Sequence, residues 1–188
     1  MQLVEPALEY LPSYAAALAT GWSPNNVTNV SAEQLTAIES DPAGFIASLV
    51  RQGGTIKLPD GTIIPKLPFI ARWMWDGEFC GSISLRWQKG TDALPPHSLG
   101  HIGYAVVPWK RGRGYASEAL RLILIEARSV GLGRVEITTD PDNRASQRVI
   151  ERNGGTFVET FVNHHYGPDP HFRYVVELNP AETREVAP

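Results

Sequence analysis

A strand, a short turn and a helix follow one another near the middle of the chain, and this order restricts the fold more than any other feature. The stretch "LGHIGYAVV" alternates in polarity up to Val107, as a half-buried strand does. Apolar residues then recur at helical spacing over 115–130, and Gly131 ends the pattern. Between them lies "PWKRGRGYA", with three cations and two glycines. We therefore predict a strand, a glycine turn and a helix that begins near Gly114.

The residue types in this turn suit an anion. A glycine turn at a helix start exposes several backbone N–H groups in one direction, and the helix dipole adds positive charge there. The common NTPase loop, Gly-x-x-x-x-Gly-Lys-Ser/Thr, is absent, and the dinucleotide fingerprint needs glycine or alanine where Ser117 stands. What remains is Arg-x-x-Gly-x-Ala, from Arg111 to Ala116. The pattern favours a phosphate-binding turn, although such a turn also occurs with no ligand.

The net charge limits which anion the turn can meet. The chain has 188 residues, with 17 Lys and Arg against 20 Asp and Glu, which gives a net charge of -3. This balance argues against a surface for nucleic acid or for an anionic membrane, so we expect neither partner. The first residues lack a basic start followed by an apolar run, and no apolar stretch is long enough to span a bilayer. We expect a cytoplasmic protein.

Cysteine and histidine usage argues against metal and disulfide chemistry. Cys80 is the only cysteine, which excludes an intramolecular disulfide and a Cys-based zinc site and suits a reducing compartment. The stretch "NHHYGPDPH" holds His164, His165 and His171. Adjacent histidines on a strand point to opposite faces, and no carboxylate or cysteine stands at ligand spacing. We expect no metal.

The other elements predict one mixed domain. Helical patterns cover 7–20, 31–40 and 41–54, and Asp-Gly pairs mark hairpins near Gly61 and Gly77. A strand "RVEITT", a helix "NRASQRVIERN" and two closing strands follow the central helix. Because no repeat or linker interrupts the order, we predict one α/β (α+β) domain over 1–180 and a frayed tail over 181–188. Its sheet is mixed, mostly antiparallel, of about seven strands, and flanked by helices.

Two motifs together resemble the GNAT acetyltransferase superfamily. The family's pyrophosphate signature, Arg/Gln-x-x-Gly-x-Gly/Ala between its fourth strand and third helix, matches Arg111 to Ala116. The family then places an Asn, a small residue three positions on, and a helix that ends in Lys/Arg-x-Gly. In "DPDNRASQRVIERNGG" these are Asn143, Ser146 and 152–154. The resemblance extends from about Phe69 to Phe157 and looks closest to a branch of uncharacterised bacterial predicted acetyltransferases.

The resemblance implies acetyl-CoA as a co-substrate. Its pyrophosphate would lie on the amides of the glycine turn, where the arginines add charge. The family's fourth and fifth strands splay apart, so amides at the end of the fourth strand can bind the pantetheine arm and polarise the thioester carbonyl. Carried over residue by residue, the implied cofactor-binding set is Val106, Val107, Arg111, Gly112, Arg113, Gly114, Tyr115, Ala116, Ser117, Asn143 and Ser146.

The resemblance also implies direct transfer of the acetyl group, so Cys80 is not needed as a nucleophile. Many relatives protonate the departing CoA thiolate with a tyrosine in the helix after the Asn motif, but Ile150 occupies that position here. Ser146, one turn earlier, is the candidate acid, although a serine early in a helix also serves as a cap. His101, acting through a water, is the candidate base, and Glu159 is the next.

These residues predict an acetyl-CoA-dependent N-acetyltransferase that acts on a primary amine of a small molecule, a peptide or a protein N-terminus. The missing tyrosine keeps a second function open, a non-catalytic module that binds or senses acyl-CoA. The closing strands "TFVETFV" and "FRYVVEL" leave edges that a partner often covers, so we also expect a homodimer.

Overall fold

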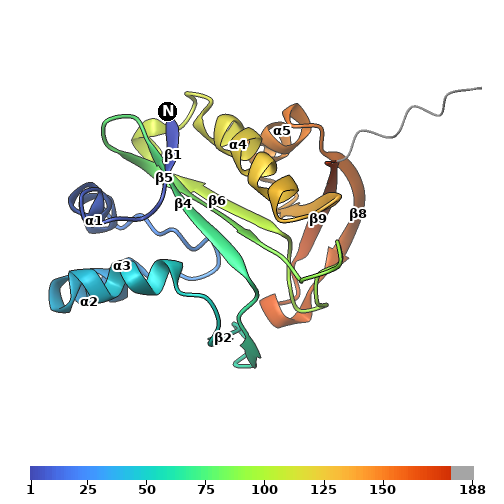
Figure 1. Cartoon of the computed structure of the whole chain (residues 1–188). Helices are drawn as coiled ribbons and strands as arrows, with labels where there is room; N and C mark the ends of the chain where they lie inside the picture. Colours follow the sequence, from blue (N-terminus) through green and yellow to red (C-terminus); the bar gives the residue numbers. More distant parts are fainter. Residues whose placement is uncertain (179–188) are drawn as a thin grey trace, which may run out of the picture.

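The computed structural model describes residues 1–178, and the predicted tail over 181–188 lies outside them (Figure 1). The helices are α1 (Leu11–Ala19), α2 (Ser31–Ser40), α3 (Pro42–Val50), α4 (Tyr115–Ser129) and α5 (Arg144–Arg152). Two short 3-10 turns are η1 (Pro108–Lys110) and η2 (His164–Tyr166). The strands are β1 (Gln2–Val4), β2 (Thr55–Lys57), β3 (Ile63–Pro65), β4 (Phe69–Trp75), β5 (Phe79–Arg86), β6 (Ile102–Val106), β7 (Arg134–Thr139), β8 (Thr156–Val162) and β9 (Pro170–Glu177).

The main sheet is divided into two parts. Strands β1-β4-β5-β6 form a four-stranded antiparallel sheet, and β7-β9-β8 form a three-stranded one. Together they account for the predicted seven strands, and β2 and β3 add a separate hairpin. Helices α1, α2 and α3 lie on one side of the four-stranded sheet, and α4 and α5 lie on the other (Figure 1). This is the single α/β domain that the sequence predicts.

The two parts meet at the start of β6. The His101 N–H donates to the Glu136 carbonyl at 2.7 Å, and the Glu136 N–H donates to Nδ1 of His101 at 2.9 Å. Beyond this junction β6 and β7 belong to different sheets, and no ladder pairs them within residues 1–178. The far ends of β6 and β7 therefore keep backbone groups that a ligand can use.

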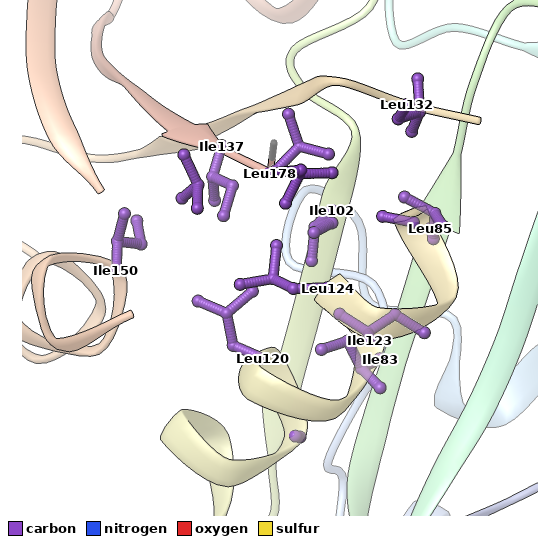
Figure 2. Packing of buried hydrophobic residues seen from close by; sticks show 14 of the residues in the cluster. Ile83, Leu85, Ile102, Leu120, Ile123, Leu124, Leu132, Ile137, Ile150 and Leu178 are labelled. Carbon is purple, nitrogen blue, oxygen red and sulfur yellow. The ribbon is translucent and has the colours of Figure 1, made fainter. Parts of the chain in front are cut away.

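The larger core lies between the sheet and helices α4 and α5. Figure 2 shows the α4 side chains of Leu120, Ile123 and Leu124 packed among those of Ile83 on β5 and Ile102 on β6. Fully burying one such side chain stabilises the fold by about 1.5–3 kcal/mol. This packing fixes α4, and with it the turn at its N-terminus, to β5 and β6.

A second core, rich in aromatic rings, lies on the side of α1 and α3. The Tyr14 ring stacks on Trp73 with centroids 4.5 Å apart, and Phe79 meets Tyr14 edge-on at 5.0 Å. Helix α3 begins where the sequence predicts, because the Asp41 side chain accepts a hydrogen bond from the Gly44 N–H. The N-terminal helices are thus held on the face opposite α4.

The thiol of Cys80 lies on β5 and is fully buried. Burial, with a smaller contribution from the Asp76 carboxylate, raises the pKa of this thiol to about 12. None of the helices in residues 1–178 is long and apolar enough to cross a bilayer. The same residues contain no group of three His, Cys, Asp or Glu side chains placed to hold a metal ion.

Candidate active site

The turn before α4 presents a row of unpaired backbone donors. Gly112 and Gly114 adopt left-handed φ angles of 75° and 79°, which a glycine tolerates best. The first α4 amide with an intrahelical partner is that of Glu118, which donates to the Gly114 carbonyl at 3.0 Å. The six amides over 112–117 have no backbone partner in the described chain. A Cβ at either glycine would meet nothing within 4 Å, so the turn is open to a ligand.

A buried ion pair anchors this turn to the β4–β5 hairpin. Nζ of Lys110, at the end of η1, lies 3.0 Å from the Asp76 carboxylate and 2.6 Å from Glu78. The Tyr115 hydroxyl donates to the same Asp76 carboxylate at 2.5 Å. The Tyr115 bond, followed by that of Lys110, lowers the pKa of Asp76, so this carboxyl is ionised at neutral pH. The predicted ligand Tyr115 therefore offers its N–H to a cofactor, while its side chain holds the turn.

Alternate backbone amides of β6 are hydrogen-bonded to β5, and those in between point toward β7. The Arg86 N–H donates to the His101 carbonyl, and the Val107 N–H donates to the Cys80 carbonyl at 3.0 Å. Odd-numbered residues of β6 thus face β5. The prediction of a free amide at Val107 is wrong, because that N–H already completes the β5 ladder. By the alternation of a strand, the N–H of Val106 faces the gap toward β7.

Other side chains confirm which groups face the gap. The Asn26 side-chain amide donates to the Tyr104 carbonyl at 3.2 Å, and Nε of Arg111 donates to the Val106 carbonyl at 3.2 Å. Even-numbered carbonyls of β6 therefore point away from β5. Arg111 thereby links the α4 turn to the strand that precedes it. Arg113 is exposed in the same turn.

A tyrosine and a serine meet across the gap. The Tyr104 hydroxyl on β6 lies 2.8 Å from Oγ of Ser146 in the first turn of α5. Asn143 caps that helix by accepting a hydrogen bond from the Ser146 N–H at 3.0 Å. Burial raises the pKa of Tyr104 to about 12, and the bond with Ser146 offsets this only in part. The phenol is therefore protonated at neutral pH and available as a proton donor.

The two predicted bases lie away from this pair. His101 is fully buried at the β6–β7 junction, where burial lowers its pKa, so the ring is neutral. Glu159 is exposed on β8 and forms an ion pair with Arg173 at 3.1 Å. No hydrogen bond or ion pair in residues 1–178 joins either of them to Tyr104 or Ser146.

Two further polar groups lie near the turn and the gap. The Thr139 hydroxyl, at the last residue of β7, is buried and makes no hydrogen bond within the described chain. The Ser117 hydroxyl accepts from the Asn153 side chain at 3.1 Å, which ties α4 to α5. The Ser117 N–H is open to an anion, and its hydroxyl, which only accepts from Asn153, keeps its own proton to donate.

Comparison with known proteins identifies the family. Residues 65–156 match the family model described as the acetyltransferase (GNAT) domain. Residues 65–156 are therefore identified as a GNAT acetyltransferase domain. No curated protein sequence matches it significantly.

Solved structures share the GNAT fold of this chain. Mycobacterium smegmatis RimJ in complex with CoA-disulfide has a TM-score of 0.63 at 19% identity, covering 93% of this chain and 80% of that chain. A Salmonella typhimurium acetyltransferase that modifies the N-terminal serine of a ribosomal subunit protein has a TM-score of 0.58 at 16% identity, covering 94% of both chains. The microcin self-immunity acetyltransferase MccE, in complex with acetyl-CoA and AMP, has a TM-score of 0.55 at 15% identity, covering 93% and 91%.

Ile150 stands where the family resemblance leads one to expect a tyrosine. That side chain is fully buried among Leu120, Ile137 and Leu178 (Figure 2), so a tyrosine ring there would have no room. The phenol near the gap comes instead from Tyr104, on a strand. Sequence reasoning singled out Ser146 but missed its pairing with Tyr104. The alternation of β6, which places Tyr104 on the α5 side of the sheet, is the signal that could have found it.

Proposed function

We propose that the protein is an acetyl-CoA-dependent N-acetyltransferase that moves the acetyl group directly to a primary amine. The observation that carries the proposal is the row of six unpaired amides over 112–117, beside the open N–H of Val106. A pyrophosphate and a thioester carbonyl need donors of these two kinds. Acetyl-CoA or CoA named in the complexes of RimJ and MccE supports the same co-substrate.

Each part of acetyl-CoA has a candidate partner on this chain. The amides over 112–117 and the helix dipole of α4 bind the pyrophosphate, with Arg113 adding charge from the exposed side of the turn. The Val106 N–H donates to the pantetheine arm or to the thioester carbonyl. The cap formed by Asn143 holds Ser146 at the gap. The buried Thr139 hydroxyl, which lacks a partner, is a further donor at the end of β7.

Acetyl transfer then needs an electrophile, a base and an acid. The amine lone pair attacks the thioester carbonyl carbon, and the Val106 N–H stabilises the oxyanion that forms. A C–N bond forms and the C–S bond then breaks. The amine nitrogen gives up its proton to water or to a base. The thiolate takes a proton from the hydroxyl pair of Tyr104 and Ser146. His101 and Glu159 stay predictions for the base.

A sensing module that binds acyl-CoA without turnover is the second candidate, and it rests on the missing helix tyrosine at Ile150. Release of free CoA on addition of amines separates the two functions. We expect steady release with at least one member of a panel of small amines, polyamines and peptides with free N-termini. The ribosomal-protein N-terminus named for the Salmonella typhimurium relative belongs in this panel. Tight binding of CoA, with no release of free CoA from acetyl-CoA for any amine in the panel, would favour the sensing module.

A homodimer through β8 fits the exposed surface of this strand. Strand β8 is the edge of the three-stranded sheet, and the side chains of Phe157, Val158 and Val162 are exposed on it. An uncovered apolar edge favours pairing with a second copy of the chain. Light scattering should then give the mass of two chains. We further propose that residues 1–180 act as one catalytic domain in the cytoplasm.

A further inference from the structure

A pocket of about 230 Å³ lies at the end of β5 that is far from the α4 turn. The β2–β3 hairpin, the start of β4, the end of β5 and η2 all contribute to its wall. Its floor is the sheet face that carries α1 and α3, because Phe69 pairs with Arg86 and Ser84 pairs with Gly103 across the strands of this face. The volume is somewhat below the range of about 300–1,000 Å³ for drug-sized ligands, so the pocket suits a smaller molecule.

The lining of this pocket is cationic and contains no Asp or Glu among the described residues. Apolar side chains such as Ile64 and Phe69 form one part of the wall. Nζ of Lys66 is held at the rim, 3.2 Å from the Arg51 carbonyl and 3.7 Å from the centre of the Phe69 ring. The polar side chains in the wall are those of Lys66, Ser84, Arg86, His97, Ser98 and Tyr166. In a chain with a net charge of -3, this is a local excess of positive charge.

Arg86 differs from the other two partly buried arginines in the sheets, Arg72 and Arg173. Arg72 on β4 forms a two-pronged bond with Glu126 at 2.8 and 3.1 Å, and Arg173 on β9 meets Glu136 at 2.6 Å. The Arg86 guanidinium forms no hydrogen bond or ion pair with residues 1–178. Burial lowers its pKa, and the neighbouring Tyr166 offsets this only in part. A desolvated guanidinium is costly unless an anion pairs with it.

We propose that this pocket is the acceptor subsite and binds a carboxylate or phosphate group of the primary-amine substrate, with Arg86 as the anchor. The proposal rests on the function proposed above. A planar guanidinium binds both kinds of oxyanion through two parallel N–H bonds. The three hydroxyls of Ser84, Ser98 and Tyr166 can complete the donor set, and the apolar wall accepts the carbon skeleton.

The strand also sets the spacing between the anion and the amine. Nη2 of Arg86 lies 3.6 Å from the position of a Cβ on Gly103, so the guanidinium lies over that residue. Gly103 is three residues before Val106, whose N–H we assign to the thioester carbonyl. Three residues of strand span roughly 10 Å. The acceptor therefore carries its oxyanion several bonds away from its amine, and an α-amino acid is too short.

The test uses three primary amines with one skeleton: para-(aminomethyl)benzoate, its neutral amide, and para-(aminomethyl)phenyl phosphate. Initial rates with acetyl-CoA give kcat/KM for each amine, and calorimetry without acetyl-CoA gives the affinity for the benzoate. In the wild type we expect one of the two anions to exceed the amide by ~10-fold to ~100-fold, as a charge-assisted pair predicts. Arg86→Gln should abolish the preference, and Arg86→Lys should keep part of it. Arg134→Gln, an exposed strand arginine on β7, is the matched control.

Each outcome decides one of the two proposals. A preference for the benzoate identifies a carboxylate acceptor, and a preference for the phosphate identifies a phosphate acceptor. If the wild type acetylates all three amines at equal kcat/KM, the subsite is wrong while the acetyltransferase stands. If the benzoate binds in an Arg86-dependent way but neither these three amines nor any member of the wider amine panel releases CoA, the oxyanion site stands and the acetyltransferase fails. The comparison among amines needs only the wild type, so a variant that does not fold cannot block the test.

Discussion

The α4 turn and the Arg86 pocket are both suited to anions, yet they are built in opposite ways. The turn uses six backbone N–H groups from successive residues over 112–117, and side chains only hold it in place. The pocket relies on side chains from separate segments, with the guanidinium of Arg86 as its main donor. A backbone N–H donor is kept when the side chain of its residue is substituted. A side-chain donor is lost when its own residue is substituted. The first design therefore tolerates changes in its side chains, and the second depends on one residue.

The largest expected effect comes from filling the turn. Gly114→Val places a branched side chain at a φ of 79° and over the amides, so we expect the affinity for CoA to fall by at least about 100-fold. Titration calorimetry with CoA measures this. Gly131→Val is the matched control, because Gly131 has a φ of 90° at the other end of α4. Equal affinity in the two variants would contradict the assignment of the pyrophosphate to this turn.

Removing the acid should act on kcat and leave binding intact. Tyr104→Phe and Ser146→Ala should each lower kcat by about 10-fold to 1,000-fold, or ~1–4 kcal/mol, with little change in the affinity for CoA. Because the two hydroxyls share one hydrogen bond at 2.8 Å, the double variant should lose less than the sum of the two single losses. Full turnover in both single variants would show that water protonates the thiolate.

The smallest expected effect is on stability, and it comes from His101 at the junction of β6 and β7. Burial lowers the pKa of His101, so the folded chain holds it neutral. As the pH falls below about 6.5, His101 becomes protonated in the unfolded chain but stays neutral in the folded chain. The free energy of unfolding therefore falls by up to ~1.4 kcal/mol per pH unit. His101→Asn keeps an acceptor for the Glu136 N–H and should flatten this dependence in denaturant titrations between about pH 5 and 6.5. His164→Asn, at an exposed histidine, should leave the slope unchanged.

Much of the fold and of the cofactor turn could be read from the sequence because both depend on local patterns. The spacing of glycines before α4 and the Asp41 cap of α3 need no long-range information. The choice between Val106 and Val107 needed the register of β6 on β5, which the sequence does not state. The same limit hid the contact between Tyr104 and Ser146, which are 42 residues apart.

The acceptor side was the least predictable part. Arg86 and Arg72 are both strand arginines, and nothing in the sequence pattern distinguishes one from the other. The difference depends on which carboxylate each one meets in space. Glu126 on α4 reaches Arg72, while the segments around Arg86 bring cations and hydroxyls. The surroundings of Arg86 are set by the packing of the β2–β3 hairpin and η2 against the sheet, which the sequence does not state.

The burial of Cys80 has a practical consequence for every assay described above. A thiol with a pKa of about 12 and no exposed surface carries almost no thiolate at neutral pH, so a thiol-reactive dye does not label the native chain. Colour that develops during a reaction therefore reports CoA alone, without a protein blank. When denaturant opens the sheet, the single thiol becomes reactive, and the same dye then counts one equivalent per unfolded chain.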